Sequence, residues 1–289
     1  MRILRKKKKR RIKRSIRRST LFLLVFCFIY SFVVQINEWR VQSKVNSVES
    51  KTTDSNHAKT PLDTLSKQTQ KESDSPTNQK IPSQPSVQQQ KIAYLTFDDG
   101  PSKLTNQILD VLKRENIQAT FFMVGTNITR YPNEVKRAVS EGNYVGAHSM
   151  THDYHKLYKQ NQFVVEMQQT ISLIKQLTGE DTNLIRAPFG TKPGLHEQLR
   201  TESANARFKV WDWTVDAVDW KNDSTPFTVI NEVNRQATKN CEVILLHEKQ
   251  ITLDSLPQII SNLRAKGYVF KSYSSKNHFP LNFWDDRRL

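Results

Sequence analysis

Two adjacent aspartates, Asp98 and Asp99, end an apolar segment of the sequence in the run YLTFDDGPS. A hydrolase that activates water with a metal ion needs one carboxylate to hold the ion and a second, close to it, to take the proton of the water. Adjacent residues that leave a strand point in different directions, so one aspartate can face the ion while the other reaches the water. The alternative is that both only form a turn before Gly100 and Pro101.

A pair of histidines, His148 and His152, stands in the run HSMTH. If this segment is helical, the four-residue spacing puts both imidazoles on one face, and such pairs suit a divalent metal. The pair alone is a weak signal, because two histidines this close are more often incidental. Combined with one aspartate, they form a set of three ligands that leaves positions open for water and substrate.

The elements that must position these residues begin at Lys91, where short apolar runs start to alternate with amphipathic segments. The runs predict seven strands, at 91–97, 119–125, 144–148, 183–189, 208–213, 242–247 and 267–273. The amphipathic segments predict five helices, at 102–116, 132–142, 162–180, 225–240 and 253–267. Strands that alternate with helices predict a parallel α/β fold, either a barrel or a doubly wound sheet.

Polar side chains lie near or just after the carboxyl ends of five of the predicted strands. In both of these folds the chemistry collects at the carboxyl ends of the strands. A fold that placed polar groups at random would seldom deliver so many to one edge, so we expect a single site there. The residues at this edge are Asp98 and Asp99, His148, Arg186, Asp216 with Asp219, and His247.

The runs TFDDGPS, HSMTH, RAPFG, DAVDW and ILLH occur in this order along the chain. In order and interval they closely resemble the five motifs of the polysaccharide deacetylase (NodB-homology) family, carbohydrate esterase family four. The resemblance covers residues 91 to about 275 and is greatest to membrane-anchored peptidoglycan N-acetylglucosamine deacetylases. It implies a distorted (β/α) barrel and metal-dependent hydrolysis of the linear amide bond of N-acetylated amino sugars.

The resemblance also implies roles for the matching residues. Asp98 resembles the catalytic base of the family, and Arg186 the arginine that pairs with the base and orients it. The implied metal ligands are Asp99, His148 and His152. The implied ion is zinc, with cobalt or another divalent ion as the alternative.

His247 resembles the general acid that protonates the leaving amine, with Asp219 beside it to raise its pKa and fix its tautomer. The backbone N–H of Phe189 is similar in position to the oxyanion donor of the family. Trp220 and Leu245 would line the pocket for the acetyl methyl, although both also suit an ordinary core.

Further residues carry less specific expectations. Exposed aromatic side chains would help to bind sugar faces, with Trp211, Trp213 and Tyr154 as candidates. Two positions depart from the family: Ala187 stands where proline is frequent, and Glu248 stands where an aspartate commonly follows the histidine. Neither change removes a functional group, so we expect activity.

The charge of the chain is concentrated at its beginning. Residues 1–20 hold twelve Lys or Arg and no acid, so without them the formal charge of +16 falls to +4. This distribution argues against a nucleic-acid-binding domain. The uncharged run 21–37 that follows predicts a transmembrane signal-anchor, with the basic segment in the cytoplasm and the rest of the chain outside. If the segment is cleaved, the protein is secreted instead.

Residues 38–90 are polar and rich in Ser, Gln and Pro, which predicts a disordered linker between the membrane and a catalytic domain at 91–289. Cys27 and Cys241 allow no disulfide within that domain. We therefore expect a monomeric N-deacetylase that acts on peptidoglycan N-acetylglucosamine and binds no nucleic acid. The alternatives are a deacetylase of chitooligosaccharide or exopolysaccharide, and a catalytically weak glycan-binding module.

Overall fold

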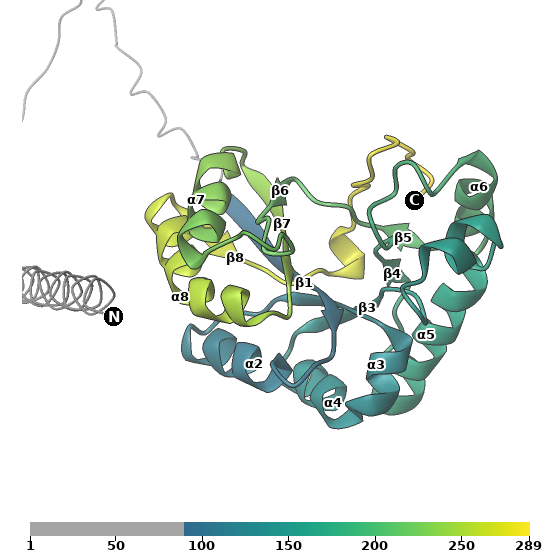
Figure 1. The fold of residues 1–289 in the computed structure, drawn as a ribbon, viewed down its shortest axis with the longest axis horizontal. Coiled ribbons are helices and arrows are strands. Elements are labelled where there is room, and N and C mark those ends of the chain that lie inside the picture. Colours follow the sequence, from purple (N-terminus) through teal and green to yellow (C-terminus); the bar gives the residue numbers. More distant parts are fainter. Residues whose placement is uncertain (1–89) are drawn as a thin grey trace, which may run out of the picture. The chain divides into compact units, whose positions relative to one another are not determined.

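The computed structural model describes residues 90–289 of the chain (Figure 1). The predicted basic segment, the signal-anchor and the linker up to residue 89 lie outside the described residues. Within the described part, no helix is both long enough and apolar enough to cross a bilayer.

One parallel sheet forms the centre of the domain. Within residues 90–289 it has eight strands, in the order β5-β4-β3-β2-β1-β7-β6, with β8 paired to β1. Every pairing between these strands is parallel, which confirms the predicted α/β class. The strands are β1 (Lys91–Gly100), β2 (Thr120–Met123), β3 (Tyr144–Ala147), β4 (Leu184–Ile185), β5 (Lys209–Val210), β6 (Val215–Asp216), β7 (Cys241–His247) and β8 (Tyr268–Phe270).

Helices cover the outside of the curled sheet, as Figure 1 shows for α8, α2, α4 and α5. All five predicted helices are present, and the short helices α3 and α6 and a π-helical turn were not predicted. Gly142, Gly179 and Gly267 follow helix ends with positive φ, as their positions in the sequence indicated. The helices are α2 (Thr105–Arg114), α3 (Gly125–Arg130), α4 (Pro132–Ser140), α5 (Phe163–Thr178), α6 (Glu197–Asn205), α7 (Pro226–Gln236) and α8 (Gln250–Ala265); the turns are η1 (His155–Lys159) and η2 (Ser275–Asn277).

The central strand β1 is buried on both faces, which explains its almost continuous apolar sequence. Leu95 and Phe97 pack against the helices in the larger core cluster. Tyr94, which points to the opposite face, packs with Trp211 in a second cluster that fills the inside of the curl. Trp211 is 1% exposed, so its assignment as an exposed sugar-binding aromatic was wrong.

The two ends of the sheet approach each other. β5 ends at Val210 and β6 begins at Val215, and a connection of this length spans at most about 18 Å. The two strands are not paired with each other within the described residues. The predicted barrel is therefore present as a curled, open half-barrel, with a β-bridge between Trp211 and Leu281 beside β5.

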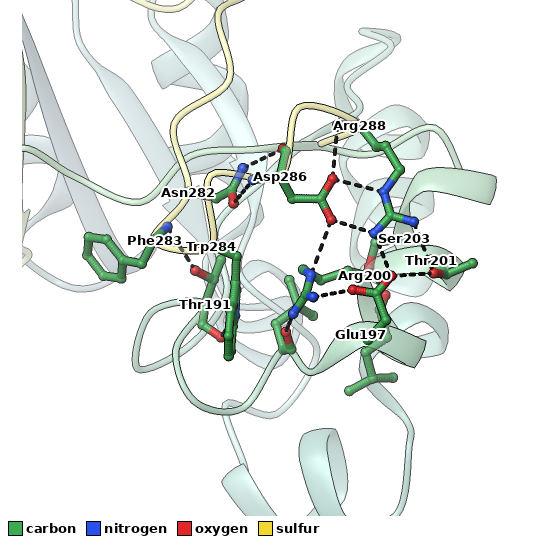
Figure 2. Close-up of polar contacts among 12 residues, drawn as sticks. Thr191, Glu197, Arg200, Thr201, Ser203, Asn282, Phe283, Trp284, Asp286 and Arg288 are labelled. Carbon is green, nitrogen blue, oxygen red and sulfur yellow. Dashed lines mark hydrogen bonds and ion pairs between the residues drawn. The ribbon is translucent and has the colours of Figure 1, made fainter.

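Residues 279–289, here called the C-terminal strap, follow η2, and Figure 2 shows their contacts with α6 and with the loop at Thr191. Arg200 on α6 donates from Nε to Asp286 Oδ2 over 3.2 Å. Hydrogen bonds from Arg288 hold the pKa of Asp286 at about 2. The side chain of Leu289 is fully buried in the core. The strap is thus an integral part of the domain.

Candidate active site

A pocket of about 370 Å³ opens at the carboxyl ends of the strands. It collects side chains from the ends of β1, β6 and β7 and from the loops that follow β3 and β4, as the sequence predicted. The residues that line it are Asp98, Asp99, His148, His152, Ala187, Phe189, Gly190, Trp213, Asp216, Trp220, Leu245 and His247.

The two aspartates point in different directions because β1 is irregular at its end. Its register with β2 shifts between Asp98 and Gly100, and Asp99 has a φ of 68°. Such a bulge re-aims the side chains around it. Asp98 is buried with 3% exposure, whereas the side chain of Asp99 is 44% exposed and faces the histidines.

Asp99, His148 and His152 converge at one side of the pocket. Asp99 Oδ1 lies 3.6 Å from His148 Nε2 and 3.3 Å from His152 Nε2. Ligand atoms about 2.0–2.1 Å from a tetrahedral ion lie about 3.3 Å apart, which agrees with this spacing. Asp99 Oδ1 is also buried without a hydrogen-bond partner. The three side chains therefore fit a divalent metal ion. They are brought together by an irregular loop and not by the helical turn that their four-residue spacing would also have allowed.

The orientation of His148 is fixed from behind. Its Nδ1 lies 2.8 Å from the carbonyl oxygen of Arg186. Because a carbonyl can only accept, Nδ1 carries the proton and Nε2 offers its lone pair to the pocket. Burial lowers the pKa of His148, which favours the neutral form that binds metals. Burial alone would raise the pKa of Asp99, but neighbouring histidines and Lys249 outweigh it and lower that pKa.

Asp98 is paired with a fully buried arginine. Arg186 Nη1 donates to Asp98 Oδ1 over 2.8 Å and to Thr96 Oγ1 over 2.7 Å. Its other nitrogens donate to the carbonyl oxygens of Trp211 and Asp212 over 2.9 and 2.8 Å. Four acceptors thus hold the guanidinium in one position, and the guanidinium in turn fixes the direction of the Asp98 carboxylate.

His247, at the end of β7, is held by Asp219. Asp219 Oδ1 lies 2.7 Å from His247 Nδ1, and Oδ2 accepts from the backbone N–H of His247 over 2.7 Å. Thr252 on α8 also donates to Asp219 Oδ2. Burial lowers the pKa of His247, but its hydrogen bond with Asp219 and the nearby carboxylates outweigh burial and raise that pKa above its ordinary value.

Aromatic and aliphatic side chains form the walls. Leu245 is buried at the base of the pocket, while Phe189 and Trp220 are 56% and 48% exposed at its rim. Trp220 Nε1 donates to both carboxylate oxygens of Asp216 over 3.2 and 3.3 Å. The sequence had placed Asp216 at this edge without identifying a partner for it. Tyr154 lies beside Phe189, with ring centroids 5.6 Å apart.

The C-terminal strap supports the wall at Gly190 and Trp213. Phe283 packs edge-on against Trp213 with centroids 5.0 Å apart, and a Cβ at Gly190 would lie 3.1 Å from the Phe283 ring. The N–H of Phe283 donates to Asp212 Oδ2 over 2.7 Å. Asp212 N donates to the carbonyl oxygen of Leu281 over 2.6 Å.

Glu248 lies behind the site with 8% exposure. Its Oε2 accepts from Ser102 Oγ over 2.7 Å and also from the Thr105 hydroxyl. Its Oε1 is buried without a partner, and a Cβ at Gly100 would lie 1.9 Å from that oxygen. Burial raises the pKa of Glu248 to about 7. Position 100 therefore needs glycine because the glutamate occupies the space of a side chain.

The sequence reasoning missed two supporting hydroxyls. Thr96 receives a hydrogen bond from Arg186 and donates to the carbonyl oxygen of Ile244. A single threonine inside the apolar run of β1 was a signal for it, because a buried hydroxyl needs partners. Thr252 gave no such signal, since it lies on an amphipathic helix where threonine is unremarkable.

Comparisons with known proteins agree with this geometry. The family profile described as polysaccharide deacetylase matches residues 86–211. A peptidoglycan-N-acetylglucosamine deacetylase of Bacillus cereus is 43% identical over 218 residues, which are 73% of this chain and 80% of that protein. The crystal structure of a polysaccharide deacetylase from Bacillus cereus is 44% identical, with a TM-score of 0.67, and the match covers 69% of this chain and 100% of that one. The catalytic domain of a peptidoglycan N-acetylglucosamine deacetylase from Eubacterium rectale is 31% identical, with a TM-score of 0.63 and coverage of 68% and 94%.

Proposed function

Because the chain belongs to the polysaccharide deacetylase family, we propose that it is a metal-dependent hydrolase that removes N-acetyl groups from peptidoglycan N-acetylglucosamine. The observation that carries this proposal is the convergence of Asp99, His148 and His152 in the same pocket as Asp98 and His247. The similarity to a peptidoglycan-N-acetylglucosamine deacetylase of Bacillus cereus supports the choice of sugar.

The metal site consists of Asp99, His148 and His152, and the proposed ion is zinc, with cobalt or another divalent ion as the alternative. When bound, such an ion polarises the acetamide carbonyl and lowers the pKa of water. The two histidines and one carboxylate match the ligand types that zinc uses in catalytic sites, where further positions stay open.

Asp98 is the proposed base that takes a proton from the attacking water. Its carboxylate lies at the pocket and is aimed by Arg186 Nη1 at 2.8 Å. A guanidinium fixed at this distance holds the carboxylate oxygen in place, so the base keeps its direction toward the pocket. Since both groups are buried, their pairing is little weakened by solvent.

His247 is the proposed acid, which gives its proton to the leaving amine nitrogen. Asp219 binds its Nδ1, so Nε2 is the nitrogen that can deliver the proton. The N–H of Phe189 is the proposed donor to the oxyanion that forms during attack. Leu245 and Trp220 would enclose the acetyl methyl, in agreement with their positions in the pocket.

We also propose that the protein is a monomer anchored in the cell membrane, with residues 91–289 outside as its catalytic domain. The twelve cations of residues 1–20, the uncharged run 21–37 and the polar linker 38–90 support this topology. Protease digestion of intact cells tests it, because the domain is expected to be degraded while cytoplasmic proteins survive. Recovery of the domain only in the medium would show that the segment is cleaved.

The proposed activity is tested by mass spectrometry of cell-wall muropeptides before and after treatment with the purified zinc-loaded protein. We expect a loss of acetyl groups from N-acetylglucosamine, and Asp98→Asn is expected to abolish it. Deacetylation of muramic acid, chitooligosaccharide or exopolysaccharide instead would correct the substrate. Glycan binding without any acetate release would identify a binding module.

A further inference from the structure

The loop that carries both histidines has no regular structure of its own. Residues 148–152 lie between β3 and η1, outside any helix or strand. Ser149 and His152 have φ values of 64° and 56°, a region that residues other than glycine seldom adopt. Contacts from other elements must therefore hold the loop in the shape that brings the two imidazoles together.

Glu166, in the first turn of α5, makes such contacts. It is 6% exposed, and its Oε2 accepts from the backbone N–H groups of Met150 and Thr151 over 3.1 and 2.9 Å. The hydroxyl of Thr151 donates to Oε1 over 2.9 Å. The carboxylate thus binds three donors that lie between the two histidines in the sequence.

The other hydrogen bonds of the loop backbone have uncharged partners. Ser149 N donates to the sulfur of Met167 over 3.3 Å, and the carbonyl oxygens of Ser149 and Met150 accept from the N-terminal turn of α3. Among the described hydrogen bonds to the backbone of residues 149–151, Glu166 is the one charged acceptor. Hydrogen bonds to ionised acceptors are about twice as strong as neutral ones.

We propose that Glu166 is a positioning residue for the metal site, which sets the spacing between the Nε2 atoms of His148 and His152. Without its carboxylate, three donors of the loop lose their partner, and the loop relaxes from its strained shape. The ligand atoms then leave the spacing that fits an ion. This inference rests on the proposed metal-dependent function but concerns a residue outside the ligand set.

The chain contains a matched control in Glu242, near the start of β7. Glu242 is 1% exposed and accepts from the N–H groups of Thr238 and Lys239 over 2.9 and 2.7 Å. The hydroxyl of Thr214 is its third donor. It therefore makes the same set of bonds as Glu166, two backbone N–H groups and a threonine hydroxyl, but in a loop without metal ligands.

The test measures zinc affinity directly, by competition between the metal-free protein and a chromophoric zinc chelator. Loss of a group that orients metal ligands typically weakens affinity 10–100-fold, so we expect a loss of about this size for Glu166→Ala. We expect Glu166→Gln to lose less zinc affinity than Glu166→Ala, because its amide oxygen still accepts both backbone donors although the charge is gone. Glu242→Ala is expected to lower stability but to bind zinc as wild type does.

Circular dichroism shows which variants are folded. If Glu166→Ala does not fold, Glu166→Asp takes its place, because the shorter side chain withdraws the carboxylate from the loop. A folded Ala or Asp variant with wild-type zinc affinity would overturn the proposal, as would an equal loss in Glu242→Ala. If the wild-type protein binds no zinc, the proposed metal site itself fails. If the wild type binds zinc and the folded Glu166 variant binds it equally well, only the positioning role fails.

Discussion

Compared with wild type, Glu248→Gln is expected to gain unfolding free energy as the pH rises. Burial raises the pKa of Glu248 from 4.5 to about 7, a difference of about 2.5 units. One unit corresponds to about 1.4 kcal/mol, so the group destabilises the fold by about 3 kcal/mol when it is ionised in both states.

The direction of the effect follows from where the proton is held. Below about pH 4.5 the carboxyl is protonated in both the folded and the unfolded chain and contributes nothing. Between about pH 4.5 and 7 the unfolded chain loses the proton while the folded chain keeps it, so wild-type stability falls across this window. Glutamine does not titrate, and its amide oxygen can still accept from Ser102 and Thr105.

Urea unfolding of the metal-free protein, followed by tryptophan fluorescence at about pH 5 and about pH 8, measures the effect. The free-energy difference between Glu248→Gln and wild type is expected to grow by about 2–3 kcal/mol between the two conditions. The exposed Glu180→Gln is the control and is expected to show little change. A Glu248→Gln difference that is the same at both pH values would refute the reasoning, because the buried carboxyl would then not hold its proton.

Three further perturbations test other contacts of the site. Asp219→Asn removes the charge that raises the pKa of His247. The alkaline limb of the pH profile of kcat/KM is therefore expected to move down by about 1–3 pH units. An unmoved limb would exclude His247 as the acid. Arg186→Met leaves the carboxylate that it binds buried and unpaired, so urea unfolding is expected to show a loss of about 3–5 kcal/mol, and a loss below 1 kcal/mol would contradict the pairing. Gly100→Ala places a methyl group 1.9 Å from Glu248 Oε1, so it is expected to lower the thermal midpoint. Adding Glu248→Ala in the same chain is expected to restore part of the loss.

The sequence predicted the fold class because hydrophobic periodicity and strand order reflect local chemistry. The five long helices have clear amphipathic patterns, whereas α3 has only six residues and α6 a weak pattern, so neither gave a usable signal. The two-residue strand β6 lies outside the predicted strands, because two residues are too few to show an alternating pattern. The curl of the sheet depends on how the strands pack, which no local pattern reports.

In the candidate site, the motif residues were predictable because they stand at the ends of apolar strands. Their arrangement was less predictable: the spacing of His148 and His152 would place both on one face of a helix, whereas the structure brings them together in an irregular loop. Glu166 could not be found from the sequence, since a glutamate in the first turn of a helix is ordinary there. The burial of Trp211 likewise depends on residues far along the chain, among them Leu281 and Tyr273.

The C-terminal strap affects the order in which the domain acquires activity. Leu281 and Phe283 bind Asp212, whose carbonyl oxygen binds Arg186, and Arg186 aims Asp98 at the other end of the described region. Contacts between such distant parts of a chain form late in folding, because a long loop must close before they stabilise anything. Pairing of β1 with β7 and β8 closes loops of similar length, so the carboxylate is aimed at about the stage at which the sheet is completed. During refolding, catalysis is expected to return only after the core has excluded water.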